Sequence, residues 1–142
     1  MRNFRISKLL KYYISKMKII FIAGPLTSGW DWKDREFLEK RIKEAEKFQI
    51  KLINSKIGCF CAHTHTSFHH EKGSEASEEF YKKMDFEFLK RMADAVLAMP
   101  KWEESSGAKE EIKFAKEKGL PIFYPKSSED IQEIIDWAKE EI

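Results

Sequence analysis

Short apolar segments alternate with longer amphipathic ones along the chain, and this alternation constrains the fold more than any other feature. The apolar segments are rich in β-branched and aromatic residues, which predicts strands. They cover residues 18–23, 51–61, 94–99 and 120–124, and the second is bent or interrupted at Gly58. Strands that alternate with helices favour a parallel sheet with helices on both faces. We therefore expect an α/β fold with a doubly wound parallel sheet of four to five strands.

The segments between these strands carry apolar residues at helical spacing and charged residues on the opposite face. Helices are expected around 37–48, at 77–92, from the 101–107 loop to Lys118, and after Ser128. Ser128 suits the N-cap of the last helix. Gly119 suits the position directly after the helix that ends at Lys118. The side chains predicted to face inward from 77–92 are Phe80, Met84, Phe88, Leu89 and Met92. Residues 62–76 are expected to form a loop.

A chain of 142 residues is long enough for one domain with a buried core. Its apolar runs fall far short of the roughly 20 residues of a membrane span, so no membrane partner is expected. The two cysteines are too close together for a disulfide framework, and no export signal is visible. These features indicate a cytoplasmic protein.

Positive charge is concentrated at the N-terminus. Residues 1–17 contain five basic side chains and no acidic one, whereas the remaining residues contain 21 basic and 24 acidic side chains. Because the rest of the chain is not basic, a nucleic acid polymer is not expected as a partner. We interpret residues 1–16 as a basic N-terminal extension and 17–142 as the domain. The alternative is a basic surface helix with apolar area from Leu9, Leu10, Tyr12, Tyr13 and Ile14.

In a doubly wound sheet, ligands bind at the carboxyl ends of the strands, where the strand order reverses. The loops expected there are 24–31, 54–76, 100–107 and 125–128. The first loop begins with Gly24-Pro25 and continues through Thr27, Ser28 and Gly29, without a P-loop lysine or a GxGxxG pattern. Its glycines and hydroxyls suit a close approach to ribose or phosphate, and an ordinary Gly-Pro turn is the alternative.

Ser105-Ser106-Gly107 stands between a predicted strand and a predicted helix. The free N–H groups of a helix N-terminus favour an anion such as phosphate. A plain serine N-cap is the alternative, and both can hold at once. Glu111 follows in the first turns of this helix, where it is either a catalytic acid or one of several exposed charges.

Two aspartates are further candidates. Asp85 lies beside the inward stripe of the helix predicted at 77–92, where an unpaired carboxylate is costly to bury and is therefore a candidate for function. Asp94 opens a predicted strand, where it caps, orients or contacts a substrate.

Cysteine and histidine alternate in one segment. The residues are Cys59, Cys61, His63 and His65, with His69 and His70 close behind. Such donors suit zinc, but alternating residues of a strand point the same way and rarely converge on one ion. We interpret the histidines as lining a substrate loop, and we expect neither a metal nor a cofactor.

Three motifs, taken in order, resemble the nucleoside 2-deoxyribosyltransferase-like superfamily. They are Phe21-Ile22-Ala23-Gly24-Pro25, then Asp85 followed by Leu89 and Ala93-Asp94-Ala95-Val96, then Trp102 to Ala108 followed by Glu111. The resemblance extends from about Met17 to Tyr124 and includes small bacterial and phage members with a segment like Ala62 to His65. It implies a flavodoxin-like fold and a homo-oligomer in which a neighbouring subunit completes the site.

The resemblance also implies a two-step reaction with retention. Glu111 would attack the anomeric carbon of a nucleoside or nucleotide, and Asp85 would help to protonate the leaving base. Gly24, Pro25, Ser105 and Gly107 would shape the sugar-phosphate site, with His63 or His65 at the base and Asp94 as a further substrate-binding candidate. Such carboxylate pairs serve glycosyl transfer because one group is ionised to attack while the other delivers a proton.

Ser105 lies six residues before the expected nucleophile, at the position that separates branches of this superfamily. Transferases that act on free nucleosides usually have aspartate there, whereas deoxynucleoside 5′-monophosphate N-hydrolases have a serine that contacts phosphate. We therefore expect hydrolysis of a nucleoside 5′-monophosphate, with base exchange on free nucleosides as an alternative. A non-catalytic nucleotide-binding module is the other alternative, because many relatives have a nucleophile-orienting tyrosine where this chain has Phe21. Tyr81 is a candidate to replace its hydroxyl.

Overall fold

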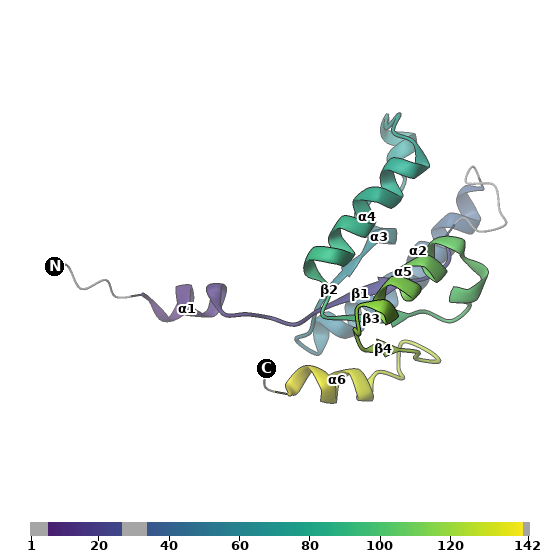
Figure 1. Ribbon diagram of the computed structural model, residues 1–142. Coiled ribbons are helices and arrows are strands. Elements are labelled where there is room, and N and C mark those ends of the chain that lie inside the picture. Colours follow the sequence, from purple (N-terminus) through teal and green to yellow (C-terminus); the bar gives the residue numbers. More distant parts are fainter. Residues whose placement is uncertain (1–5, 27–33, 141–142) are drawn as a thin grey trace.

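A computed structural model describes residues 6–26 and 34–140 of the chain (Figure 1). Its centre is a parallel four-stranded sheet in the order β2-β1-β3-β4. The strands are β1 (Ile19–Ala23), β2 (Gly58–Cys61), β3 (Ala95–Ala98) and β4 (Ile122–Phe123). This arrangement confirms the expected α/β fold and is consistent with a flavodoxin-like architecture.

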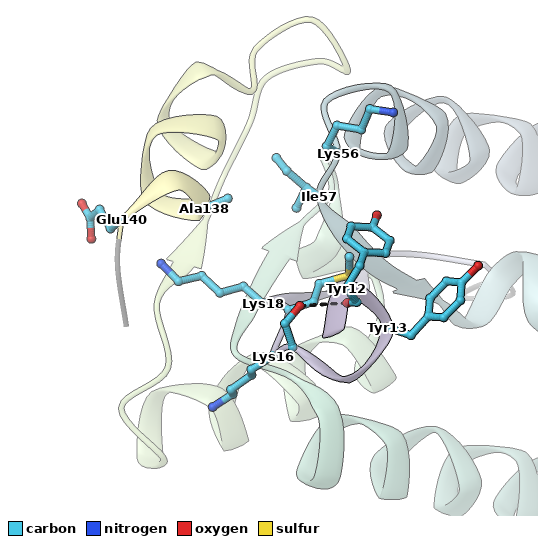
Figure 2. A pocket seen from close by; sticks show the side chains of 10 residues that line it. Tyr12, Tyr13, Lys16, Lys18, Lys56, Ile57, Ala138 and Glu140 are labelled. Carbon is cyan, nitrogen blue, oxygen red and sulfur yellow. Dashed lines mark hydrogen bonds between the residues drawn. The ribbon is translucent and has the colours of Figure 1, made fainter. Parts of the chain in front are cut away.

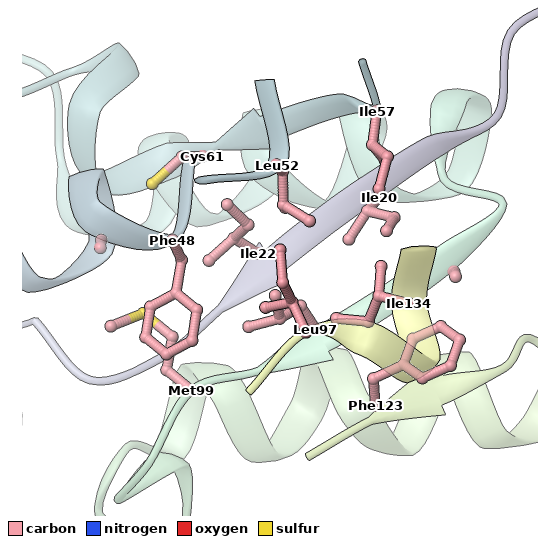
Figure 3. Close-up of a cluster of buried hydrophobic side chains, with 13 residues drawn as sticks. Ile20, Ile22, Phe48, Leu52, Ile57, Cys61, Leu97, Met99, Phe123 and Ile134 are labelled. Atoms are coloured by element: carbon pink, nitrogen blue, oxygen red, sulfur yellow. The ribbon is translucent and has the colours of Figure 1, made fainter. Parts of the chain in front are cut away.

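Helices cover both faces of the sheet because alternate residues of the central strands face opposite sides. Ile20 and Ile22 of β1 belong to one apolar cluster, which includes residues of α2 (Arg35–Asn54) and α6 (Gln132–Lys139). Figure 3 shows Phe48 and Leu52 of α2 meeting these strand residues. Phe21 and Ala23 belong to the second cluster, with residues of α4 (Glu78–Met92) and α5 (Ser106–Glu117).

The predicted strand at 51–61 is wrong in its first half. Helix α2 continues to Asn54, because Leu52 extends the buried stripe formed by Ala45 and Phe48 and is itself fully buried. Lys56, with a φ of 62°, reverses the chain before β2 begins at Gly58. A Cβ atom at Gly58 would lie 2.7 Å from Ile19 Cδ1, so the close approach of β1 accounts for this glycine.

The segment 62–76, expected to be a loop, contains a short helix α3 (Ala62–His65) and a 3₁₀ helix η1 (His69–Lys72). A second 3₁₀ helix, η2 (Trp102–Glu104), precedes α5. Helix α5 ends as predicted, since Gly119 has a φ of 74° and the N–H of Leu120 bonds to the carbonyl of Ala115.

Ser128 does not cap the last helix. Helix α6 starts at Gln132, with the buried Ile131 at its N-cap position. The preceding residues form a turn in which Asp130 accepts a hydrogen bond from the N–H of Lys126. Ser128 therefore lies inside a turn and not at the helix start.

The inward stripe predicted for α4 is only partly correct. Leu89 is buried, whereas Phe80 is 57% exposed and Met92 is 36% exposed. Phe88 packs inward against Phe60, and its outer edge joins Phe80, Met84 and Met92 in lining a groove of about 450 Å³. Helical periodicity alone did not distinguish the exposed Phe80 and Met92 from the residues that face the sheet.

The N-terminal segment contains a short helix, α1 (Lys8–Ile14), that has no buried residue. Figure 1 shows it at a distance from the helices that cover the sheet. A hollow of about 780 Å³ lies between its tyrosines, Lys56 and α6, beside the amino-terminal edge of the sheet (Figure 2). Within the described residues, no helix is long and apolar enough to cross a membrane.

Candidate active site

The sheet topology puts a crevice at the carboxyl ends of β1 and β3. From β1 the chain goes to β2 on one side, and it then crosses to β3 on the other. Gly24 and Pro25 directly follow β1, and the η2 turn and the start of α5 follow β3. Loops that leave adjacent strands in opposite directions open the position where ligands of such sheets bind. Thr27, Ser28 and Gly29 of the predicted loop lie outside the described residues.

Two carboxylates come together on the α4–α5 side of this crevice. Asp85 projects from α4 and Glu111 from α5, and the two helices contact each other. A helical side chain leans towards the helix N-terminus, which brings the Glu111 carboxylate back over the first turn of α5. Accordingly, Glu111 Oε1 lies 4.0 Å from the position that a Cβ atom of Gly107 would occupy. A side chain at position 107 would therefore begin in contact with this carboxylate, and Gly107 keeps that position clear.

Burial shifts the titration of both acids in the same direction. It raises the pKa of Glu111 to about 8, with a further increase from the charge of Asp85. It raises the pKa of Asp85 to about 6. Asp85 Oδ1 is buried and has no hydrogen-bond partner among the described residues. Between about pH 6 and 8 the pair therefore holds one proton, so that one group is ionised and the other is an acid.

Ser105 caps α5. Its side chain is buried, and its Oγ accepts a hydrogen bond of 3.1 Å from the N–H of Ala108. This confirms the serine N-cap expected from the sequence. The interaction uses the hydroxyl as an acceptor only, so an anion at the same helix start remains compatible with it.

Phe21 lies in an aromatic stack between the sheet and α4. It is fully buried, with its ring centroid 5.7 Å from that of Phe60, which in turn stacks on Phe88 at 4.5 Å. His65 packs edge-on against Phe60 and Phe88. Tyr81 does not supply the missing hydroxyl to Glu111, because its own hydroxyl bonds to Ser74 and His69. The pair is therefore supported by packing on this side.

His63 lies under the loop that follows β1. Its side chain is 6% exposed, and Nε2 donates a hydrogen bond of 3.0 Å to the carbonyl of Pro25. Burial lowers the pKa of His63, so the ring is neutral and Nδ1 is an acceptor. Nδ1 is buried and finds no partner within 6–26 or 34–140. His63 Nδ1 is thus a buried acceptor without a donor among the described residues.

Two of the predicted site residues have structural roles. A Cβ atom on Gly24 would lie 2.6 Å from Met99 Sδ and 2.9 Å from Met99 Cβ, so Gly24 allows β1 and β3 to end in close contact. Asp94 lies at the opposite, amino-terminal edge of the sheet, where its carboxylate accepts a hydrogen bond of 2.8 Å from the N–H of Ile19. The structure does not bring Asp94 together with the carboxylate pair.

The cysteines and histidines do not converge. Within the residues that the structure describes, no group of three potential ligands is arranged to hold a metal ion. Cys61 packs in the cluster under α2, whereas His65 packs against Phe60 and Phe88 on the side of α4.

Sequence reasoning missed Arg41. This residue of α2 is 12% exposed, and its guanidinium lies 3.6 Å from the carboxylate of Glu104, in the turn just before Ser105. Its charge also contributes to the lowered pKa of His63. In the sequence Arg41 is one of many charged residues on an amphipathic helix, and only the fold shows that it reaches the carboxyl edge of the sheet.

This site lies within a recognised sequence family. A family model described as "Domain of unknown function (DUF4406)" matches residues 17–124. The chain belongs to this family. The DUF4406 span begins just before β1 and ends just after β4, so it includes the whole sheet and both carboxylates and leaves out α1 and α6. A search of curated proteins found no match to the chain.

Proposed function

We propose that this DUF4406 protein cleaves the N-glycosidic bond of a nucleoside 5′-monophosphate. The observation that carries the proposal is the juxtaposition of Asp85 and Glu111, two partly buried acids of raised pKa close to Gly107, which has no side chain. Raised and unequal pKa values are typical of carboxylates that exchange protons during a reaction. The sequence resemblance adds the class of bond, and we propose deoxyribose as the sugar.

The proposed reaction has two displacements. A Glu111 carboxylate oxygen attacks C1′ of the sugar, the C1′–N bond breaks with its electron pair going to the base, and Asp85 donates a proton to that base. Water then attacks C1′ and gives its proton to Asp85, and the bond between C1′ and Glu111 breaks. The products are the free base and a sugar 5-phosphate of retained configuration, and both acids return to their initial states.

The pKa order sets a condition on this reaction. In the free protein Glu111 has the higher pKa, so it holds most of the shared proton. Attack requires that proton to lie on Asp85 instead. Positive charge that develops at C1′ beside Glu111 favours the ionised form of Glu111, and Lys82 on α4 acts in the same direction.

Phe21 supports a second candidate, a nucleotide-binding module without catalysis. Within the described residues, no hydroxyl takes the place of the tyrosine that orients the nucleophile in many similar sequences. This candidate predicts that nucleotides bind without any product. Base exchange on free nucleosides is a third candidate, and it predicts that a second base is incorporated in preference to water.

We also propose that the protein forms a homodimer through α4. The groove residues Phe80, Met84, Phe88 and Met92, of which Phe80 and Met92 are exposed, are symmetric about residue 86, so an antiparallel copy places each phenylalanine opposite a methionine. The same pairing brings the acidic first turn, with Glu78 and Glu79, near the basic last turn of the partner. Lys83, Lys90 and Arg91 surround the single Glu87, so this part of α4 has a net positive charge. That charge attracts the acidic first turn of the other copy.

The decisive experiment follows base release from nucleoside 5′-monophosphates and free nucleosides by chromatography. We expect release from a monophosphate, a loss of at least about 100-fold in Glu111→Gln, and a smaller loss in Asp85→Asn. Glu117→Gln, at an exposed position of the same helix, is the matched control and should keep full activity. If the folded wild-type protein binds nucleotides but releases no base from any compound, the hydrolase proposal fails and the binding module is favoured.

A further inference from the structure

Arg41 is a largely buried cation with unused hydrogen-bond donors. A guanidinium has five N–H donors, and the Arg41 side chain is 12% exposed. Its contacts among the described residues are the loose ion pair with Glu104 at 3.6 Å and the face of Phe37 at 4.8 Å. The ion pair is too long for a hydrogen bond, and Glu104 itself is 56% exposed. None of its nitrogen atoms is among the buried polar atoms that lack a partner in the described residues, so the unused donors reach solvent and are open to a ligand.

The position of Arg41 places this charge at the crevice. Its helix, α2, lies on the face of the sheet opposite to α4 and α5, yet the guanidinium reaches Glu104, which immediately precedes the N-cap of α5. His63, on the other side of β1, adds a buried Nδ1 atom without a partner among the described residues. An arginine, a neutral histidine and the free N–H groups of a helix N-terminus thus gather around the ends of β1 and β3.

We propose that Arg41 and the start of α5 form a binding site for the phosphate of the substrate. The inference rests on the proposed function and adds Arg41 as a residue that binds the anionic end of the substrate. A phosphomonoester fits because its oxygens accept hydrogen bonds from both the guanidinium fork and backbone N–H groups. In the free protein Glu104 forms a weak ion pair with Arg41, and this ion pair breaks when the anion binds.

Inorganic phosphate is the first probe, because it tests the site without any reaction. Phosphate binding is followed by NMR titration of the wild-type protein, Arg41→Gln, Arg41→Lys and Lys43→Gln. Lys43 is an exposed cation on the same helix, so its variant controls for the loss of one charge. We expect Arg41→Gln to weaken binding by at least about tenfold, Arg41→Lys to recover part of it, and Lys43→Gln to match the wild type. Glu104→Gln should bind phosphate more tightly, because Arg41 then has no competing carboxylate.

The outcomes separate this site from the proposed reaction. Arg41-dependent phosphate binding without base release supports the anion site and removes the hydrolase function. Base release that is equally efficient in Arg41→Gln and in the wild type overturns the anion site and leaves the function in place. Circular dichroism verifies that each variant is folded. A wild-type protein that binds no phosphate at millimolar concentration, or a folded Arg41→Gln variant that binds it as well as the wild type, also overturns the proposal.

Discussion

At the residue scale, Glu111 ties the stability of the fold to pH. Its pKa is about 8 in the folded protein, whereas a glutamate in an unfolded chain titrates near about 4.3. The folded state therefore binds this proton more tightly than the unfolded state. The resulting contribution to stability is complete below about pH 4 and is lost as the pH rises through 8.

This linkage predicts a pH-dependent effect of Glu111→Gln, because glutamine is neutral and is not subject to this loss. Relative to the wild type, the variant should gain free energy of unfolding between pH 5 and 8, on the order of 2 kcal/mol. Urea denaturation at several pH values measures the difference. Glu117→Gln is the control, and its stability should run parallel to the wild type. A constant difference between Glu111→Gln and the wild type across this range would show that Glu111 ionises normally in the folded state.

At the scale of elements, the type of each main helix and strand was predictable and several boundaries were not. Apolar periodicity located α4 and α5, and Gly119 marked the end of α5. The end of α2 was missed because residues 51–57 have the composition of a strand. Packing of Leu52 against the sheet favours the helix, and the sequence does not show this contact.

The candidate site was predictable to a similar degree. The motifs singled out Glu111 and Asp85, but the spacing in sequence says nothing of how α4 and α5 pack. Arg41 and the hydrogen bond between His63 and Pro25 depend on contacts between distant segments, so no local pattern indicates them. Asp94 was misleading because its motif lies at the amino-terminal end of β3, where it bonds to the backbone of β1.

A further prediction concerns Ser105 at the start of α5. Its hydroxyl caps the helix, whereas its lack of charge permits an anion to bind there. Ser105→Ala removes the acceptor for the Ala108 N–H and should lower the free energy of unfolding by about 1 kcal/mol. Ser105→Asp retains an acceptor and should recover most of this stability, yet its negative charge should abolish phosphate binding. Denaturation curves and phosphate titrations of the two variants provide both readouts. Phosphate binding that persists in Ser105→Asp would place the anion elsewhere.

At the scale of the whole molecule, α4 links the site to the proposed dimer. Leu89 anchors the helix to the sheet, Asp85 faces α5, and the groove that runs from Phe80 to Met92 is left on the outside. A sheet-covering helix with exposed large apolar side chains along an apolar groove is typical of an interface. Pairing of α4 with its copy would hold the helix that carries Asp85 in place from its outer side as well.

This arrangement predicts that Phe80→Lys converts a dimer into a folded monomer. Phe80 is 57% exposed, so its replacement should leave the stability of the monomer within about 0.5 kcal/mol, while a lysine opposite Met92 of the partner subunit opposes association. Sedimentation velocity at micromolar concentrations measures the oligomeric state. Ile53→Lys is the matched control, because Ile53 is 54% exposed on α2 and lies outside the groove, so this variant should remain dimeric. A monomeric wild type, or dimers that persist in Phe80→Lys, would exclude α4 as the interface.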